Sequence, residues 1–153
     1  MINIIAAIGK NNELGKDNKL VFNVPEDLKY FKEITTNKTV VMGYNTYKSI
    51  GKALPNRTNI VLTKKDIILD DVFICNNYKD ILSINEDIFI IGGESIYKLF
   101  LPYADNLYLT EIDKEVDADT FFPKFNKNLY DKEIIKENSF NNLKYKFVVY
   151  KRR

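Results

Sequence analysis

The sequence predicts one α/β domain with a central eight-stranded sheet, mixed but mostly parallel, four flanking helices and a C-terminal antiparallel hairpin. Short apolar runs alternate with segments of helical spacing over the first two thirds of the chain, which is the pattern of a parallel sheet. Strand patterns follow one another without helices in the last third, which indicates antiparallel pairing. The length of 153 residues is that of a single domain, residues 1–153.

The elements can be predicted in order from these patterns. The first strand, Ile2–Ile8, is an apolar run ended by Gly9, as in a strand buried on both faces. Similar runs predict four more strands in this part of the chain, at Thr39–Met42, Asn59–Thr63, Val72–Cys75 and Ile88–Ile91. Helical spacing is found at about 25–35, 44–50, 78–84 and 94–100.

The last third contains three predicted strands, Leu107–Ile112, Lys132–Ser139 and Lys144–Lys151. Asn141-Asn142 supplies the turn of a hairpin between the last two. The polar stretch Lys10–Lys19 is expected to be a long loop, and long loops beside functional sites often act as lids.

Composition and charge narrow the function classes. A net charge of +2 gives no argument for nucleic acid, and Lys151-Arg152-Arg153 is expected to be a solvated end. The chain has no histidine and only one cysteine, so a metal centre is not expected. Cys75 is expected to be a buried free thiol, and a chain without disulfides is suited to a reducing compartment. Apolar runs are shorter than the roughly 18 residues of a membrane helix, and no basic leader precedes the first strand. These observations predict a cytoplasmic protein.

Asp27 is the most informative single residue. Val24, Leu28, Phe31, Ile34 and Thr35 form one expected buried stripe of the helix at 25–35, and Asp27 falls inside this stripe, whereas Glu26 lies opposite. A buried carboxylate needs a partner, a ligand or a raised pKa. A helix-capping role is the alternative, since Asp is common in a first turn opened by proline. Because the chain lacks histidine, a tuned carboxylate is a candidate for proton chemistry.

Two strand ends carry glycines that lead into helices. Ile91 is followed by Gly92-Gly93, and Met42 by Gly43, so both helix starts could hold phosphates of a dinucleotide; simple tight turns are the alternative. Lys64 and Lys65, which follow the strand ending at Thr63, could contact a further phosphate on the ribose, or be solvated. Arg57 could clamp a carboxylate, or form a surface ion pair.

These pieces, in this order, resemble the dihydrofolate reductase family, in particular its monomeric bacterial type. The matching segments cover nearly the whole chain: Ile5-Ala6-Ala7, Leu14-Gly15, Asn23 to Leu28 with Phe31 and Lys32, Val41-Met42-Gly43, Thr46 with Ser49-Ile50-Gly51, Leu54 to Arg57, Ile91-Gly92-Gly93 with Tyr97, Leu109-Thr110 and Asp119-Thr120. The resemblance implies NADPH-dependent reduction of 7,8-dihydrofolate to tetrahydrofolate, with hydride added at C6 and a proton at N5. It also implies a monomer whose partners are dihydrofolate and NADPH, without nucleic acid or membrane.

The resemblance further implies roles for individual residues. Asp27, Phe22 and Thr110 would be catalytic, with Asp27 binding the pterin amino group and N3. The substrate would also contact Ile5, Leu28, Phe31, Ile50, Lys52, Leu54, Arg57 and Ile91. The cofactor would contact Ala7, Leu14, Gly15, Asn18, Leu20, Gly43, Tyr44, Asn45, Thr46, Leu62, Thr63, Lys64, Gly92, Gly93, Glu94, Ser95, Ile96 and Tyr97. A cis peptide bond is implied between Gly92 and Gly93, and a mobile lid over Leu14 to Phe22.

The chain departs from the family pattern at three places. Val21-Phe22 replaces the usual Pro-Trp of the lid, so an indole N–H beside the substrate is missing. Tyr44 stands where many relatives carry arginine, which leaves Lys64 as chief candidate for the 2′-phosphate. Ala118 stands where some relatives have glycine in the loop that supports the lid.

Two other functions fit part of the pattern. A pyrimidinone reductase of riboflavin synthesis shares the fold and NADPH, but it does not explain Asp27 together with Arg57. A nucleotide-binding module without catalysis would be expected to lose Asp27 or the Gly92-Gly93 pair, and both are present.

Overall fold

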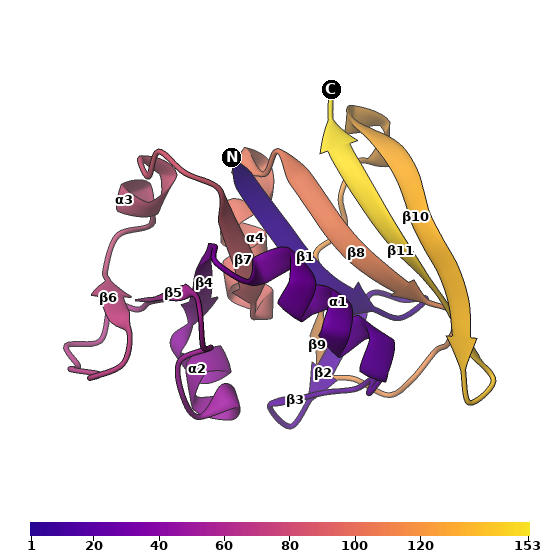
Figure 1. The fold of residues 1–153 in the computed structure, drawn as a ribbon, viewed down its shortest axis with the longest axis horizontal. Helices are drawn as coiled ribbons and strands as arrows, with labels where there is room; N and C mark the ends of the chain where they lie inside the picture. The colour runs from indigo at the N-terminus through magenta and orange to yellow at the C-terminus, as the bar shows by residue number, and fades with distance from the viewer.

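The computed structural model describes residues 1–153, which are built around one large sheet (Figure 1). The strands of this sheet are β1 (Ile2–Ile8), β4 (Thr39–Gly43), β5 (Thr58–Leu62), β6 (Phe73–Cys75), β7 (Ile88–Gly92), β8 (Asn106–Ile112), β10 (Tyr130–Phe140) and β11 (Leu143–Arg152). Their order is β10-β11-β8-β1-β7-β4-β5-β6. The six strands from β8 to β6 pair in parallel, and β11 pairs antiparallel with both β8 and β10. The predicted mixed, mostly parallel eight-stranded sheet is therefore confirmed.

Helices cover both faces of the sheet. They are α1 (Pro25–Thr35), α2 (Tyr44–Ile50), α3 (Tyr78–Leu82) and α4 (Glu94–Phe100), with short 3₁₀ turns at Leu101–Tyr103 and Lys127–Leu129. Ile4, Ile90 and Phe100 belong to the larger core cluster, on the face of α3 and α4. Ile5 and Phe89 point to the other face, where α1 and α2 pack. Because successive strand residues point to opposite faces, continuous apolar strands serve both layers.

The C-terminal hairpin forms as predicted. Asn141 and Asn142 connect β10 to β11 with φ values of 49° and 64°. Positive φ at both central residues suits the twist of a two-residue hairpin, and asparagine tolerates this conformation better than most residues.

The expectation of a long loop at Lys10–Lys19 is wrong. This segment contains β2 (Glu13–Lys16) and the start of β3 (Lys19–Leu20), which form a second, three-stranded sheet with β9 (Thr120–Phe121) in the order β3-β2-β9. The small sheet lies beyond the carboxyl ends of the large sheet's parallel strands (Figure 1). Its strands are two to four residues long, and β2 is completed by a partner about a hundred residues away, so local hydrophobic alternation could not reveal it.

Three local predictions also need correction. The helix expected at 78–84 ends at Leu82. Leu28 is not part of a buried stripe, because its side chain is 55% exposed. Cys75 is only partly buried, and its Sγ donates to the carbonyl of Asn77 at 3.1 Å. None of the helices reaches the length and hydrophobicity that a membrane-spanning helix requires.

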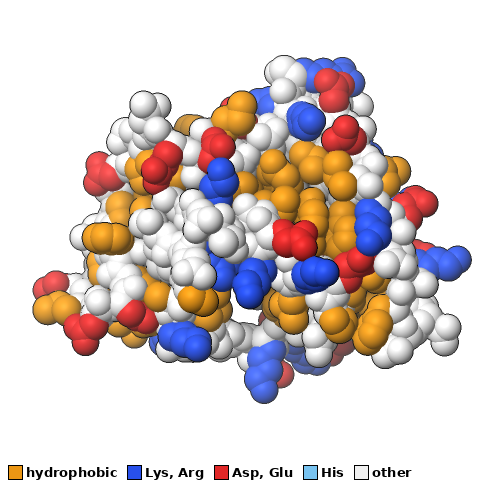
Figure 2. Space-filling model, in the orientation of Figure 1, with side chains coloured by type: hydrophobic (Ala, Val, Ile, Leu, Met, Phe, Trp, Pro, Cys, Tyr) orange, Lys and Arg blue, Asp and Glu red, His pale blue; other side chains and the backbone are white.

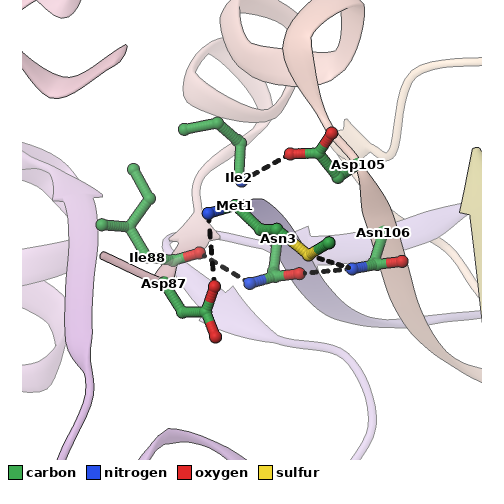
Figure 3. A network of polar contacts seen from close by, with 7 residues as sticks. All are labelled: Met1, Ile2, Asn3, Asp87, Ile88, Asp105 and Asn106. Atoms are coloured by element: carbon green, nitrogen blue, oxygen red, sulfur yellow. Dashed lines mark hydrogen bonds and ion pairs between the residues drawn. The ribbon is translucent and has the colours of Figure 1, made fainter. Parts of the chain in front are cut away.

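A polar network ties together the amino ends of the three central strands (Figure 3). It consists of Met1, Ile2, Asn3, Asp87, Ile88, Asp105 and Asn106. The Ile2 N–H donates to the Asp105 carboxylate at 2.9 Å, and the buried Asn3 amide donates to the Ile88 carbonyl at 3.2 Å. Asn106 donates in turn to Asn3 Oδ1 at 2.9 Å. The network therefore sets the register of β1 against β7 and β8 at the edge opposite the small sheet.

At their carboxyl ends, β1 and β7 separate. Their pairing stops at Ile4 and Ile90, although both strands continue further. The register between β4 and β7 also shifts at this point, so Ile91 has no partner on either side. A place where neighbouring parallel strands part at their carboxyl ends is where open α/β sheets bind ligands.

Candidate active site

Asp27 lies in the first turn of α1 and points to the sheet. Its Oδ1 accepts a hydrogen bond at 2.5 Å from the hydroxyl of Thr110 on β8, a residue that is 2% exposed. The residue at the helix N-terminus, Val24, makes no side-chain cap. Because the Asp27 carboxylate bonds a strand across the interface, the capping alternative is not supported.

The environment of Asp27 favours its protonated form. Burial raises the pKa of the Asp27 carboxyl, and the hydrogen bond from Thr110 opposes this by stabilising the ionised form. No cationic side chain forms an ion pair with Asp27. A carboxylate that is buried without a cation leaves room for a ligand to supply the missing donors.

Arg57 lies at the other end of α1. Its Nη1 donates to Thr35 Oγ1 at 2.9 Å, its Nε donates to the Pro55 carbonyl at 3.0 Å, and the guanidinium lies 5.9 Å from the centre of the Phe31 ring. Arg57 forms no ion pair, so the predicted alternative of a surface ion pair is not found. Partial burial lowers the pKa of Arg57, but the group stays cationic, and its Nη2 keeps free donors for an anion.

α1 separates the two charged groups by a defined length. Asp27 and Thr35, which holds Arg57, are eight residues apart on this helix, and a rise of 1.5 Å per residue places them about 12 Å apart along the axis. A ligand that reached both would have donors at one end and an anionic group at the other.

Apolar side chains lie between these ends. Leu28 is 55% exposed and Ile50 is 39% exposed, while Phe31 and Leu54 are half-buried. Leu28 and Phe31 are on α1, Ile50 ends α2 and Leu54 follows it, and the surface is indented between the areas of α1 and α2 (Figure 2). Exposed hydrophobic side chains on both walls of a cleft are typical of a site for an apolar ligand. Phe22 is half-buried beside α1, and Lys52 is exposed after α2.

Backbone groups at the separated strand ends complete the inner part of the site. The Ile5 carbonyl accepts a hydrogen bond at 2.8 Å from the hydroxyl of Tyr97, which is buried in α4. Ala7 pairs with Thr110 across β1 and β8, so both lie on the α1 face. A carbonyl oxygen has a second lone pair, so Ile5 can accept a ligand donor as well as Tyr97.

The glycine turns leave a groove between the starts of α2 and α4. The Gly92-Gly93 peptide bond is cis, as predicted. A Cβ at Gly92 would lie 3.5 Å from Thr46 Oγ1, and one at Gly93 would lie 3.4 Å from the same atom. Neither helix has a side-chain cap at its N-terminus. The free first amides of both helices therefore border a space that side chains would fill, which fits the phosphates of a dinucleotide.

Tyr44 marks the outer end of this groove and has two lysines beside it: Lys65, which the sequence predicts as a phosphate contact together with Lys64, and Lys48, which the sequence analysis does not identify. Lys48 Nζ and Lys65 Nζ lie 4.9 Å and 5.0 Å from the centre of the Tyr44 ring. Lys48 could have been found, because it follows Tyr44 by four residues on one helix. Lys64 is exposed and makes no hydrogen bond or ion pair. Leu62 and Thr63 lie at the end of β5, where Leu62 pairs with Gly43, while Asn45 lies in the first turn of α2, and Ser95 and Ile96 lie in the first turn of α4.

The small sheet is placed as a cover for the site. The Asn18 carbonyl accepts from Ser49 of α2 at 2.7 Å, and the Gly15 carbonyl accepts from the amide of Asp119 at 2.9 Å. The predicted supporting loop around Ala118 therefore does contact the predicted lid. Leu14 is buried in the larger core cluster, so only its backbone is available to a cofactor, whereas Leu20 is exposed.

Glu94, at the start of α4, connects the small sheet to the groove between α2 and α4. Its carboxylate accepts a hydrogen bond at 2.5 Å from the amide of Phe121 in β9. Glu13, buried in β2, accepts from the amides of Asn11 and Val116 at 2.6 and 2.8 Å. Sequence analysis gave no sign of the Glu13 contacts, which join segments far apart in the chain.

A cavity of about 1340 Å³ lies elsewhere, between the ends of β8 and β11 and the segment 121–127, and it contains none of the predicted site residues. No group of three or more His, Cys, Asp or Glu side chains is arranged to hold a metal ion. The buried acid, the arginine and the glycine groove together define an α/β enzyme that brings a dinucleotide and an anionic, partly apolar second ligand together over separated parallel strands.

Comparisons with known proteins show which family has this arrangement. The family model of dihydrofolate reductase matches residues 1–152. Dihydrofolate reductase of Bacillus subtilis is 39% identical over 160 aligned positions, which cover 100% of this chain and 95% of that protein. The Haemophilus influenzae enzyme is 43% identical over 126 positions, covering 80% and 79%. The chain belongs to the dihydrofolate reductase family.

A solved structure agrees with this assignment. Dihydrofolate reductase from Enterococcus faecalis, complexed with NADP(H) and RAB-propyl, superposes with a TM-score of 0.92 and 31% sequence identity. The match covers 100% of this chain and 96% of that one.

The raised pKa of Asp27 predicts a pH-dependent cost to stability. The folded state binds this proton more tightly than the unfolded state, so the contribution of Asp27 to stability falls as pH rises from the unfolded value of about 4 through the folded value. Asp27→Asn keeps an acceptor for Thr110 and removes the buried charge. We expect the ligand-free variant to have a higher melting temperature than wild type at pH 7, with the difference shrinking towards pH 4.

The matched control is Asp66→Asn, which changes an exposed carboxylate without hydrogen bonds or ion pairs and should show no such trend. If Asp27→Asn lowers the melting temperature at pH 7, then the Thr110 bond to a charged acceptor outweighs the cost of burial.

Proposed function

We propose that this protein catalyses the NADPH-dependent reduction of 7,8-dihydrofolate to 5,6,7,8-tetrahydrofolate, and so supplies one-carbon metabolism. The observation that carries this function is the pairing of a buried, cation-free Asp27 with Arg57 at opposite ends of α1. Dihydrofolate has a donor-bearing pterin, an apolar middle and a glutamate tail, which match this order of groups. Full-length membership of the dihydrofolate reductase family supports the same activity.

Asp27 and Thr110 would bind the pterin. The ionised Asp27 carboxylate accepts from the pterin amino group and N3, and this pairing replaces the solvation that burial removed. The carbonyls of Ile5 and Ile91 would accept from the remaining pterin donors. Leu28, Phe31, Ile50 and Leu54 would pack on the apolar middle of the substrate, and Lys52 would lie near its tail.

Asp27 would also promote the protonation that the reaction requires at N5. It is the only carboxyl group that the structure places against the inner part of the site. Phe22 has no hydrogen-bonding group, so the lid would exclude water at that point rather than hold it. Burial raises the pKa of Asp27, which shifts it towards the range in which a carboxyl group can assist proton uptake.

The cofactor groove fits a dinucleotide with the nicotinamide near Ala7. NADPH, when bound, supplies the hydride that reaches C6. The free amides after Gly43 and Gly93 would bind its phosphates, with Thr46 between them. The relative from Enterococcus faecalis, which is complexed with NADP(H), supports this choice of cofactor.

The proposal includes a monomer in the cytoplasm as a single functional domain. The single cysteine, Cys75, is free, which suits a reducing compartment. All of the proposed site residues lie on one chain, so the site does not require a second copy. Neither alternative, a riboflavin-pathway reductase or a non-catalytic nucleotide-binding module, explains why Asp27 and Arg57 are present at opposite ends of α1.

The decisive experiment measures NADPH oxidation on addition of dihydrofolate to the purified protein, by the loss of cofactor absorbance. Wild type should turn over, and Asp27→Asn should be slower by about 10²- to 10⁴-fold at neutral pH, because positioned acid–base assistance is lost. The variant should bind NADPH normally. Its residual rate should increase as pH falls, since solution acid then supplies substrate protonated at N5. A variant with nearly wild-type rate at neutral pH would refute the role of Asp27.

Arg57→Lys should weaken dihydrofolate binding, because a point charge cannot reproduce the guanidinium fork. Losing one partner of a desolvated charged pair costs about 2 to 5 kcal/mol, so the dissociation constant should rise by at least tenfold. Titration of a pterin without glutamate is the matched control and should show no change. Equal losses for both ligands would mean that Arg57 supports the fold rather than the tail.

Lys64→Ala should narrow the preference for NADPH over NADH. A charge-assisted contact contributes roughly 1.5 to 3 kcal/mol, which is about 10- to 100-fold in the ratio of kcat/KM values. Lys65→Ala is the comparison, since this lysine lies beside Tyr44. If only Lys65→Ala changes the ratio, then Lys65 and not Lys64 reads the additional phosphate.

A further inference from the structure

Glu26, the residue before Asp27, makes three long-range hydrogen bonds. Its Oε2 accepts from Lys136 Nζ at 2.6 Å, and its Oε1 accepts from Asn138 Nδ2 at 2.9 Å and from Tyr145 Oη at 2.7 Å. We call these four residues the Glu26 clasp. It joins the first turn of α1 to both strands of the C-terminal hairpin, although sequence analysis had placed Glu26 on the solvent side of the helix.

A β-bulge makes the clasp possible. The register of β10 against β11 pairs Ile134 with Val148 and then Lys136 with Phe147, so one additional residue lies between them. A shift of one residue moves the following side chains to the other face of a sheet. Lys136 and Asn138 are thereby turned to the face of Phe147 and Tyr145, which is the face that α1 covers.

The residue that caps the N-terminus of α1 does not attach this end of the helix by a side-chain hydrogen bond. Val24 gives no side-chain cap, and apart from the bond between Asp27 and Thr110 the other contacts of this end are apolar, with Val24 packed near Tyr145 and Tyr30 stacked on Phe147 at 4.2 Å between ring centres. Apolar contacts are not directional and allow small rotations of a helix. Three hydrogen bonds to one carboxylate do fix a direction.

The electrostatics agree with a carboxylate held in its charged form. The hydrogen bonds from Lys136, Tyr145 and Asn138 hold the pKa of Glu26 at about 2, and burial together with Glu26 raises the pKa of Tyr145 to about 12. The clasp therefore keeps its protonation state across the pH range in which Asp27 is expected to titrate.

We propose that Glu26 is a positioning residue for dihydrofolate reduction: the Glu26 clasp fixes the rotation of the first turn of α1 and so holds Asp27 against Thr110 and the pterin. This inference rests on the proposed function. An exposed ion pair alone would contribute little and would not explain why two uncharged donors from two strands converge on one carboxylate. A displacement of about 1 Å at a catalytic group can cost on the order of 10²-fold in rate.

The first test compares Glu26→Ala with Glu26→Gln. In the glutamine variant Oε1 can still accept from Asn138 and Tyr145, whereas the alanine variant loses all three bonds. We expect Glu26→Ala to slow hydride transfer at saturating ligands by about tenfold or more and to weaken dihydrofolate binding. NADPH affinity should stay within about twofold, and Glu26→Gln should recover most of the rate.

Two controls separate positioning from general stability. Glu33→Ala removes an exposed glutamate of α1 whose side chain makes no hydrogen bond or ion pair. Glu133→Ala removes a glutamate of β10 that forms an ion pair only with Lys151, at 3.7 Å. Neither should change the rate. Tyr145→Phe removes one donor and retains the ring beside Phe147, so it should show a smaller loss in the same direction even if Glu26→Ala folds poorly.

The second test asks whether Glu26 acts through Asp27. In an Asp27→Asn background, Glu26→Ala should reduce hydride transfer by less than about twofold, because contacting residues that act as one unit are not additive. An undiminished effect in that background would overturn the proposal. So would a Glu26→Ala enzyme that melts earlier but transfers hydride at the wild-type rate. If wild type itself does not reduce dihydrofolate, the proposed function fails instead.

Discussion

The hydrogen bond between Asp27 and Thr110 joins the two parts of the structure on which the site depends. It connects the first turn of α1 to β8, and it is the only hydrogen bond from a protein side chain to a carboxylate that burial makes costly to ionise. The hydrogen bond alone leaves the charge without a cation. Under the proposed function, the donors of the pterin supply the remaining stabilisation of this charge.

The other half of the site lies in the large sheet, at the point where the pairing of β1 with β7 stops. β1 and β7 are fixed together at their amino ends through the network around Asn3, and they separate after Ile4 and Ile90 (Figures 1 and 3). The backbone groups beyond that point are free for ligands, and the glycine turn at Gly92-Gly93 opens the space towards Thr46. In the proposed function, this sheet would bring the two ligands together, with Asp27 on one side and the groove at Gly92-Gly93 on the other.

Buried and half-buried carboxylates connect the small sheet and the C-terminal hairpin to the elements beside them. Glu13 and Glu94 bind backbone amides of the segment that supports the small sheet, while Glu26 binds the hairpin. Each of these carboxylates accepts from groups far away in the chain, so each joins elements that strand pairing alone would leave independent. Leu28 and Ile50 differ from these carboxylates, since they are exposed hydrophobic residues that the proposed substrate would cover.

The sequence by itself determined the eight-stranded sheet, the four helices, the hairpin turn at Asn141-Asn142 and the anomalous place of Asp27. These features follow from periodicity, from glycine and asparagine at turns and from a polar residue in an apolar stripe, all of which are local. Only the tertiary structure decided the pairing of β2 with β9, the exposure of Leu28 and the partners of Glu26. Strands of two to four residues and long-range hydrogen bonds depend on which distant segment lies beside them in the fold. A bulge of one residue in β10 decides on which face of the sheet the Lys136 side chain lies. The periodicity of side chains does not show which distant segments lie together, because it shows only which face of its own helix or strand a residue occupies.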